Sequence, residues 1–345
     1  MRGGLSDRCG DRKYSLFTAL EPSGMPAFEP FEQFDDIEDV VEQLNDPDPN
    51  TRRVAVINIA DSADPLAVGY LRDALADDAT EVRLQIALAL GEFDGAETAS
   101  ALAVAVTDAD NGVAQAAADS MAELKDPSAA DPIFPIVTHE NAFVREAALR
   151  ALKELRRPDC LKPALEAFAD PEIGVRVQAI GVVGYLQSEE TLPALISMLK
   201  DREAIVRRTA TGALGFSATN TAAEAVASAL TDKDWQVREV AAETLSKIKS
   251  STAVEPLRSA INDDYWQVRQ KAIRSLGKLN AKEAIQDITP SLDHDISNLR
   301  KEAAAALGEI ADPSAISALE KHIEDPDPDV RKNIRWALGQ IRASL

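Results

Sequence analysis

The sequence predicts an all-α protein in which about ten helical hairpins of 31 residues each stack into one continuous array. Three observations lead to this prediction. Arg recurs with a strict period of 31 residues from Arg52 to Arg331. Small and aliphatic residues dominate the apolar fraction, while aromatics make up only 5 % of the chain, a composition that suits closely packed helices. The chain has 345 residues, too many for one ordinary compact core.

Two columns of charged residues define the repeat. Ala114 is the one exception among the ten positions of the Arg column, and His139 and His294 are the two exceptions in an Asp column six residues earlier. A fixed period of this length indicates stacked supersecondary units. The Arg column contains Arg52, Arg83, Arg145, Arg176, Arg207, Arg238, Arg269, Arg300 and Arg331, and the Asp column contains Asp46, Asp77, Asp108, Asp170, Asp201, Asp232, Asp263 and Asp325.

Each repeat is expected to form two helices. The first follows a polar or Pro-containing turn, as in "DPSAISALEKHIED", and the second follows an Asp-rich turn, as in "DPDVRKNIRWALGQI". Asp, Asn and Pro in these turns can cap the second helix. Positions −1, +3 and +7 relative to the Arg column are apolar or small almost throughout, so they should face the core. One hairpin cannot bury its apolar face alone, whereas stacked hairpins share a core.

This pattern resembles the HEAT-repeat family, most closely the short bacterial form called the phycobilisome-lyase HEAT-like repeat. The resemblance rests on the turn Asp, the "VR" and the following "AA-x-AL-G", as in "VRLQIALALGEF" and "LRKEAAAALGEI", and it covers the chain from about residue 34. It implies a right-handed α-solenoid in which the Arg and Asp columns form a ladder from repeat to repeat. It also implies that the second helices line the concave face.

Residues 34–345 are therefore predicted to form a single solenoid of ten repeats. Residues 1–33 contain Gly, Pro and mixed charges and fit no repeat. We expect them to form a disordered tail.

The net charge of −21 argues against binding to nucleic acid or to anionic membranes through the overall field. No apolar run approaches the ~18 residues of a membrane span, and the N-terminus lacks the features of a signal peptide, so we expect a cytoplasmic protein. The charge is uneven, because residues 34–141 contain 23 acidic and 5 basic residues. A monomer is expected rather than an obligate oligomer.

Positions −3, +1, +5 and +9 relative to the Arg column share one side of each second helix and are expected to face solvent. We call these four positions the exposed row. In repeats five to eight the row includes several apolar and aromatic residues, which is typical of an interaction surface. We call the following set the aromatic patch: Ile173, Val177, Tyr185, Arg208, Phe216, Trp235, Trp266 and Arg274.

Two alternatives remain open for the aromatic patch. Its side chains could bind a partner, or they could fold back and fill gaps between neighbouring repeats. Trp336, in the last repeat, is assigned to a C-terminal cap.

The first four repeats place acidic residues in the same row. We call this set the acidic groove: Asp61, Glu92, Asp119, Glu123, Glu146 and Glu154. A basic partner segment could be steered by these charges and held by the aromatic patch. Solubility or adaptation to salt is the alternative explanation of the acidity.

The sequence contains no Gly-rich phosphate loop and no recognisable nucleophile motif. Deoxyhypusine hydroxylase is built from similar repeats and uses several His–Glu pairs to hold two irons, but only His139–Glu140 forms such a pair here, so we exclude that activity. His139 and His294 are interpreted as turn residues that replace Asp. Cys160 is interpreted as a packed turn residue, with a reactive or cluster-binding thiol as the alternative. No catalytic residue, metal site or cofactor is predicted.

The preferred function is a non-enzymatic scaffold or adaptor that binds a partner protein, or a basic segment of one, on the concave face. The alternative is a lyase-like or chaperone-like component that hands a bilin or an iron–sulfur cluster to a client protein. An enzyme with its own active site has the least support.

Overall fold

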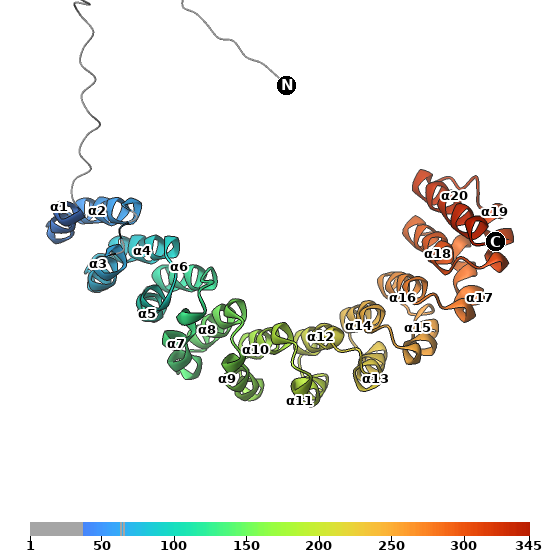
Figure 1. Cartoon of the computed structure of the whole chain (residues 1–345), viewed down its shortest axis with the longest axis horizontal. Helices are drawn as coiled ribbons and strands as arrows, with labels where there is room; N and C mark the ends of the chain where they lie inside the picture. Colours follow the sequence, from blue (N-terminus) through green and yellow to red (C-terminus); the bar gives the residue numbers. More distant parts are fainter. Residues whose placement is uncertain (1–36, 63, 65) are drawn as a thin grey trace, which may run out of the picture.

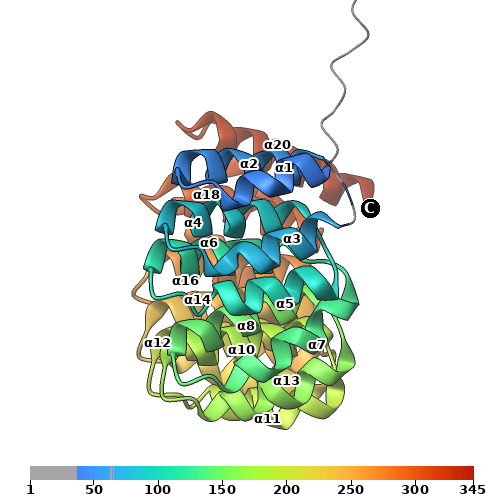
Figure 2. The same cartoon turned by 90° about the vertical axis from the view of Figure 1, so that its left-hand side faces the viewer.

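The computed structural model describes residues 37–62, 64 and 66–345, which form ten helical hairpins in succession. Figure 1 shows that the hairpins follow a single strongly curved arc, with the two ends of the arc on the same side. Seen from the N-terminal end in Figure 2, successive hairpins form layers. The predicted right-handed α-solenoid is confirmed. The expected disordered tail, residues 1–33, lies outside the described residues.

Every hairpin pairs a first helix on the outer side of the arc with a second helix on the inner side (Figure 1). The first helices are α1 (Ile37–Glu42), α3 (Ala67–Asp73), α5 (Ala96–Ala105), α7 (Ala130–Ile133), α9 (Leu161–Glu166), α11 (Leu192–Met198), α13 (Asn220–Ser228), α15 (Val254–Ala260), α17 (Ile285–Ile288) and α19 (Ile316–Lys321). The second helices are α2 (Pro49–Asp61), α4 (Thr80–Ala89), α6 (Asn111–Ala122), α8 (Ala142–Leu155), α10 (Ile173–Leu186), α12 (Ala204–Ala213), α14 (Trp235–Ile248), α16 (Trp266–Lys278), α18 (Ser297–Ile310) and α20 (Pro328–Ala343).

Short 3-10 helices precede or extend many of the α-helices. Pro135 and Pro290 each lie in a 3-10 segment that replaces the second half of a first helix, because proline cannot donate the backbone hydrogen bond of an α-helix. The 3-10 helices are Gln43–Asn45, Ala74–Ala76, Leu90–Glu92, Pro127–Ala129, Phe134–Thr138, Pro158–Cys160, Ala167–Ala169, Glu189–Thr191, Leu214–Phe216, Ala229–Thr231, Ser251–Ala253, Lys282–Ala284, Thr289–Asp293 and Pro313–Ala315.

The core lies between the two layers of helices and runs the whole length of the arc. The +7 position is buried in all ten repeats, as the sequence predicts: Ile59, Leu90, Met121, Leu152, Val183, Leu214, Leu245, Leu276, Leu307 and Leu338. Alanine at +3 is equally buried, as in Ala148 and Ala241, so neighbouring helices pack closely.

Asp and Asn side chains begin several of the second helices. Asp48, Asp110, Asn141, Asp234 and Asp327 each accept a hydrogen bond from a backbone N–H in the first turn of the following helix. This is the capping role that the sequence predicts, and it satisfies donors that would otherwise have no partner in the helix.

The Arg and Asp columns form an interrupted ladder. In the Arg83 rung, Nε and Nη2 donate to the two carboxylate oxygens of Asp108 in the next repeat, at 2.7 and 3.2 Å, while Nη1 donates to the backbone carbonyl of Asp77. Each such Arg therefore joins one repeat to the next and also fixes its own turn. The rungs are Arg52–Asp77, Arg83–Asp108, Arg145–Asp170, Arg176–Asp201, Arg207–Asp232, Arg238–Asp263 and Arg300–Asp325.

The remaining members of the two columns form no rung among the described residues. Arg331 donates to the carbonyls of Asp325 and Pro326, and Asp46 accepts from the N–H of Asp48. The Nε atom of Arg269 is buried without a hydrogen-bond partner, because the ladder position it faces is occupied by His294 and not by Asp.

Both histidines of the Asp column act as turn residues. His139 Nδ1 accepts a hydrogen bond from the N–H of Asn141 at 3.1 Å, and His294 Nδ1 accepts one from the N–H of Ile296 at 2.9 Å. The ladder aspartates accept the same bond from the residue two positions on, as Asp201 does from Glu203. The interpretation of these histidines as replacements for Asp is confirmed.

Glycines at +8 allow close approach between second helices. A Cβ added to Gly184 would lie 2.8 Å from the Cβ of Ala213, and one added to Gly308 would lie 2.8 Å from the Cα of Ala337. Both contacts are shorter than atoms tolerate, so glycine is required where these helices touch. The contacts join helices of the inner layer, and they therefore help to set the curvature of the arc.

Candidate functional site

The exposed row lies on the second helices and is accessible along the whole arc. None of its members in the described residues is buried, as the sequence predicts. Residues of this row line shallow hollows between neighbouring second helices, one of which is bordered by Asp61, Leu88 and Glu92 and another by Asp119, Arg150 and Glu154. The row is therefore part of the surface that a molecule inside the arc would meet.

The aromatic patch is most open in the fifth repeat, on α10. Ile173 and Tyr185 are 38 % and 39 % exposed, although both are large and apolar. Arg156 donates a hydrogen bond to the Tyr185 hydroxyl, and its guanidinium lies 4.8 Å from the centre of the Tyr185 ring. This pair holds an aromatic surface and a cation side by side on the inner face of the arc.

Two glycines in the exposed row separate the apolar members of the patch. Gly181 lies between Val177 and Tyr185 on α10, and Gly212 lies at the same position of the next repeat. A Cβ at Gly181 would meet only the Lys153 side chain at 3.4 Å, and one at Gly212 only Val240 at 3.6 Å. Packing therefore does not require glycine at either position, although glycine inside a helix costs about 1 kcal/mol relative to Ala.

Trp235 joins two repeats. Its ring stacks on Tyr265 of the next repeat with the centres 5.3 Å apart and the planes 7° apart. The ladder residue Arg238 lies 5.5 Å from the centre of the same Tyr265 ring. Trp235 and Trp266 are half-buried and pack against the core, as Val177 and Phe216 do. The tryptophans thus contribute to packing between repeats and also keep part of their surface accessible.

The two arginines of the aromatic patch already have partners within the chain. Arg208 donates to the side-chain oxygen of Gln236 at 3.1 Å. Arg274 makes two hydrogen bonds to the carboxylate of Glu302, at 2.9 and 2.6 Å, and Gln270 also donates to Glu302. The Arg274–Glu302 pair joins α16 to α18, the two helices between which Arg269 forms no rung.

The acidic groove contains both free and paired carboxylates. Asp119 accepts a hydrogen bond from Arg150 at 2.7 Å, and Glu154 lies near Lys125 and Lys153 at 3.8 and 3.2 Å. Glu146 packs over Gly174, where a Cβ would lie 2.1 Å from its carboxylate oxygen. Asp61, Glu92 and Glu123 have no ion-pair partner among the described residues and are exposed. Among the described residues, the groove therefore has carboxylates without an ion-pair partner at the +9 position of the first three repeats and at Glu146.

The exposed row also contains apolar residues that were not predicted to belong to a binding surface. Leu88 is 49 % exposed on α4, and Ile57 is half-buried beside it on α2. Trp336, assigned to a C-terminal cap, is 43 % exposed, and its ring lies against Gly308 of the preceding repeat. All three occupy the +5 position, so a comparison of that column across the repeats would have identified them.

Cys160 is fully buried in the turn before α9. Burial raises the pKa of its thiol to about 11, with a smaller contribution from the nearby charge of Asp159. The thiol is therefore protonated at neutral pH, which supports the packing role and not the reactive thiol.

Two features are absent from the part of the chain that the structure describes, residues 37–62, 64 and 66–345. No group of three or more His, Cys, Asp and Glu side chains in that range is arranged to hold a metal ion. None of the helices there combines the length and apolar character that a membrane span requires.

The fold is similar to that of solved importin-β structures. Yeast importin-β (Kap95p) matches with a TM-score of 0.61 and 15 % identity over 88 % of this chain and 50 % of its own. Kap95p with RanGDP gives 0.63 and 15 % identity over 88 % and 49 %, and the Kap95:Nup1 complex gives 0.63 and 15 % identity over 90 % and 50 %. The chain spans about half the length of these relatives, and the likeness concerns the fold.

The sequence itself was also compared with known families and proteins. No curated protein gives a significant match to this chain. The model of HEAT repeats matches residues 37–120, 99–172, 161–246, 223–305 and 291–344, which together span nearly all of the described chain. With its ten stacked hairpins and its Arg–Asp ladder, this chain belongs to the HEAT-repeat family.

Proposed function

We propose that this chain is a non-enzymatic scaffold that binds a partner protein on its concave face, across repeats five to eight. The observation that supports this most strongly is the combination of exposed Ile173 and Tyr185 with the two glycines, Gly181 and Gly212, that packing does not require. A surface without side chains between apolar residues lets a partner approach the helix backbone closely. Exposed apolar side chains around that surface supply the energy of association.

The charge of the arc supports a partner with a basic segment. In the part of the chain that the structure describes, Asp61, Glu92 and Glu123 of the first three repeats have no ion-pair partner. Such charges raise the rate at which a basic partner reaches the groove, and the effect weakens with salt. The structural neighbours in complex with RanGDP and Nup1 are solenoids of similar fold that bind proteins. This supports protein binding by the present chain, and it does not identify the partner.

The experiment is a capture assay with purified chain and a lysate of the source organism, followed by direct binding measurements with each captured protein. The double variant Ile173→Ser and Tyr185→Ser should lose the partner, because it removes the exposed apolar surface. Ile323→Ser is the control, since Ile323 is exposed to a similar extent in the turn between α19 and α20. Equal capture by the wild type, the double variant and the control would contradict the proposal.

The resemblance to phycobilisome-lyase HEAT-like repeats supports a second candidate, in which the chain hands a bilin or an iron–sulfur cluster to a client. An absorption spectrum of protein purified from its own host distinguishes the two functions. Bands of a chromophore or cluster in stoichiometric amount would favour the second candidate. The cytoplasmic location and the monomeric state remain predictions that the same purification tests.

A further inference from the structure

A second apolar surface lies at the acidic end of the arc, between α2 and α4. Its floor is formed by Ile57, Leu88 and Phe93, and the carboxylates of Asp61 and Glu92 lie at its border. Half of the Leu88 side chain is accessible, and Phe93 is half-buried. The hollow lies three repeats before the aromatic patch, so it is a separate surface on the same concave face.

The carboxylates at the +9 position of the first three repeats differ from two others of the acidic groove. Among the described residues, Asp61, Glu92 and Glu123 have no ion-pair partner, whereas Asp119 and Glu154 in the same groove are neutralised by Arg150 and by Lys125 and Lys153. Burying an apolar side chain beside unpaired carboxylates is favourable when the incoming segment also brings positive charge.

The spacing of the three free carboxylates restricts the segment that could meet them. They occupy the same +9 position in three successive repeats, and neighbouring helices of packed layers lie about 8–10 Å apart. A polyproline II segment rises about 3.1 Å per residue with three residues per turn, so every third side chain lies on one side, about 9 Å from the last. Basic side chains at every third position of such a segment therefore have about the same spacing as the carboxylates of Asp61, Glu92 and Glu123.

The seventh and eighth repeats carry the opposite charge at the same position. Lys247 and Lys278 occupy +9 in the seventh and eighth repeats, and both are exposed. A basic segment is therefore less favoured at these two repeats than at the first three. A bound partner would then place its basic part on α2, α4 and α6.

We infer that the hollow between α2 and α4, together with Asp61, Glu92 and Glu123, binds an extended basic segment of the partner that places one apolar side chain against Ile57 and Leu88. This inference rests on the proposed function, because it names the chemistry of the same partner. It adds a second contact region and a rule for the partner sequence: Lys or Arg at every third residue, with an apolar residue beside them.

The test uses the full chain and synthetic fluorescent peptides, with binding measured by fluorescence anisotropy at low and high salt. The first peptide has Arg at positions one, four and seven, one Leu between two of them, and Pro at other positions to favour the extended form. The second has the same composition with the three Arg residues adjacent. We expect the first to bind about tenfold more tightly, because only its charges match the spacing of the repeats.

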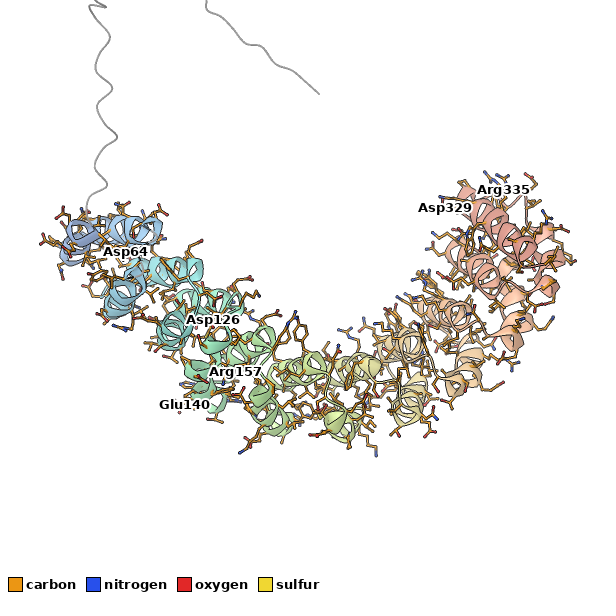
Figure 3. All side chains as sticks on the ribbon, in the orientation of Figure 1. Asp64, Asp126, Glu140, Arg157, Asp329 and Arg335 are labelled. Carbon is orange, nitrogen blue, oxygen red and sulfur yellow. The ribbon has the colours of Figure 1, made fainter. Side chains whose placement is uncertain are left out.

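Variants of the chain locate the bound peptide. Leu88→Ser should weaken binding about tenfold, and Glu92→Gln should weaken it and reduce its dependence on salt. Val104→Ser and Glu140→Gln are the matched controls, because Val104 is 59 % exposed on the first helix α5 and Glu140 lies on the outer side of the arc (Figure 3). Neither control should change the affinity by more than about twofold.

The outcomes separate this inference from the proposed function. Equal binding of the two peptides, or equal binding by Leu88→Ser and Val104→Ser, overturns the inference and leaves the role of the aromatic patch intact. Loss of the natural partner from the Ile173→Ser and Tyr185→Ser variant, with peptide binding retained, shows that the two surfaces act separately. Failure of the first peptide to bind the wild-type chain also overturns the inference.

Discussion

His294 occupies a turn position that is Asp in eight repeats, and it retains one of the two roles of that Asp. It accepts the backbone hydrogen bond of Ile296, but it offers no carboxylate to Arg269 of the preceding repeat. His139 has the same turn role in the fourth repeat, where the residue that would face it is Ala114. The two histidines therefore differ only in whether an Arg is available to form a rung.

Replacing His294 by Asp should complete a rung with Arg269. We expect the free energy of unfolding to rise by about 1 kcal/mol, since the new pair is bidentate and partly buried. His139→Asp provides the matched control, because Ala114 cannot pair with the new carboxylate. Urea unfolding of the two variants measures the difference, and an equal shift in both would show that the gain does not come from the ladder.

The carboxylate of Asp108 gives the ladder a defined pH dependence. The hydrogen bonds from Arg83 lower the pKa of Asp108, and partial burial of the carboxyl opposes this shift without cancelling it. A carboxyl with a lowered pKa stabilises the fold fully above its unfolded value of about 3.9, and the contribution is lost as the pH falls through the folded value.

Asp108→Asn should therefore destabilise the chain by about 1–2 kcal/mol at pH 7 and by progressively less below about pH 4. The measurement is the difference in urea midpoint between the variant and the wild type at pH 7, 5 and 3. A destabilisation that stays constant or grows on acidification would contradict the assigned role. The variant and the wild type have almost the same net charge. Charge repulsion across the whole molecule is therefore nearly the same in both, and it cancels in the difference between their urea midpoints.

At the scale of helices, the glycines at +8 determine how closely the second helices approach. The ring of Trp336 lies over Gly308, and a Cβ there would be 2.5 Å from that ring and 2.8 Å from the Cα of Ala337. Gly308→Ala should cost about 1–3 kcal/mol, because α18 and α20 must separate or their side chains must move. Gly339→Ala at the same position of the last repeat should stabilise the chain, since no atom lies within 4 Å of its added Cβ.

Small-angle scattering and thermal unfolding together test this account of curvature. The Gly308 variant should unfold at lower temperature and show a more open arc, whereas the Gly339 variant should keep the wild-type scattering curve. Unchanged stability in the Gly308 variant would mean that the close approach of α18 and α20 contributes little to the fold.

The order of the helices and the core could be predicted from the sequence because one period fixes both. The −1, +3 and +7 columns are apolar in repeat after repeat, so their burial follows from the periodicity of a helix. The 3-10 ends of α7 and α17 could be anticipated only from Pro135 and Pro290. The missing rungs could be predicted from Ala114, His139 and His294. That the Nε of Arg269 is buried without a hydrogen-bond partner is seen only in the structure.

At the scale of the whole molecule, the exposed row carries most of its acidic residues in the first four repeats and most of its aromatic residues in repeats five to eight. The sequence predicted the acidic and the aromatic parts of this row, because the columns separate exposed from buried positions, but it did not predict the role of Ile57 and Leu88 among the acidic repeats. It could not predict that Trp235 would stack on Tyr265, since that contact depends on how two turns meet between repeats. It also could not show which carboxylates are paired, because long side chains such as those of Arg150 and Lys125 reach between repeats.

The central claim is that the concave surface between repeats five and six is shaped for a partner and not for the stability of the fold. Gly181 and Gly212 are the residues that test it, because an added Cβ meets neighbours there only at ordinary contact distances. Replacing both glycines by alanine should therefore raise the free energy of unfolding and lower the affinity for the partner.

The most direct measurement combines urea unfolding and partner affinity for the double variant Gly181→Ala and Gly212→Ala, with Gly339→Ala as the control. The double variant should be more stable by about 1–2 kcal/mol and should bind the captured partner at least about tenfold more weakly. The control should gain stability and keep its affinity. A double variant that gains stability and binds the partner as tightly as the wild type would contradict the claim.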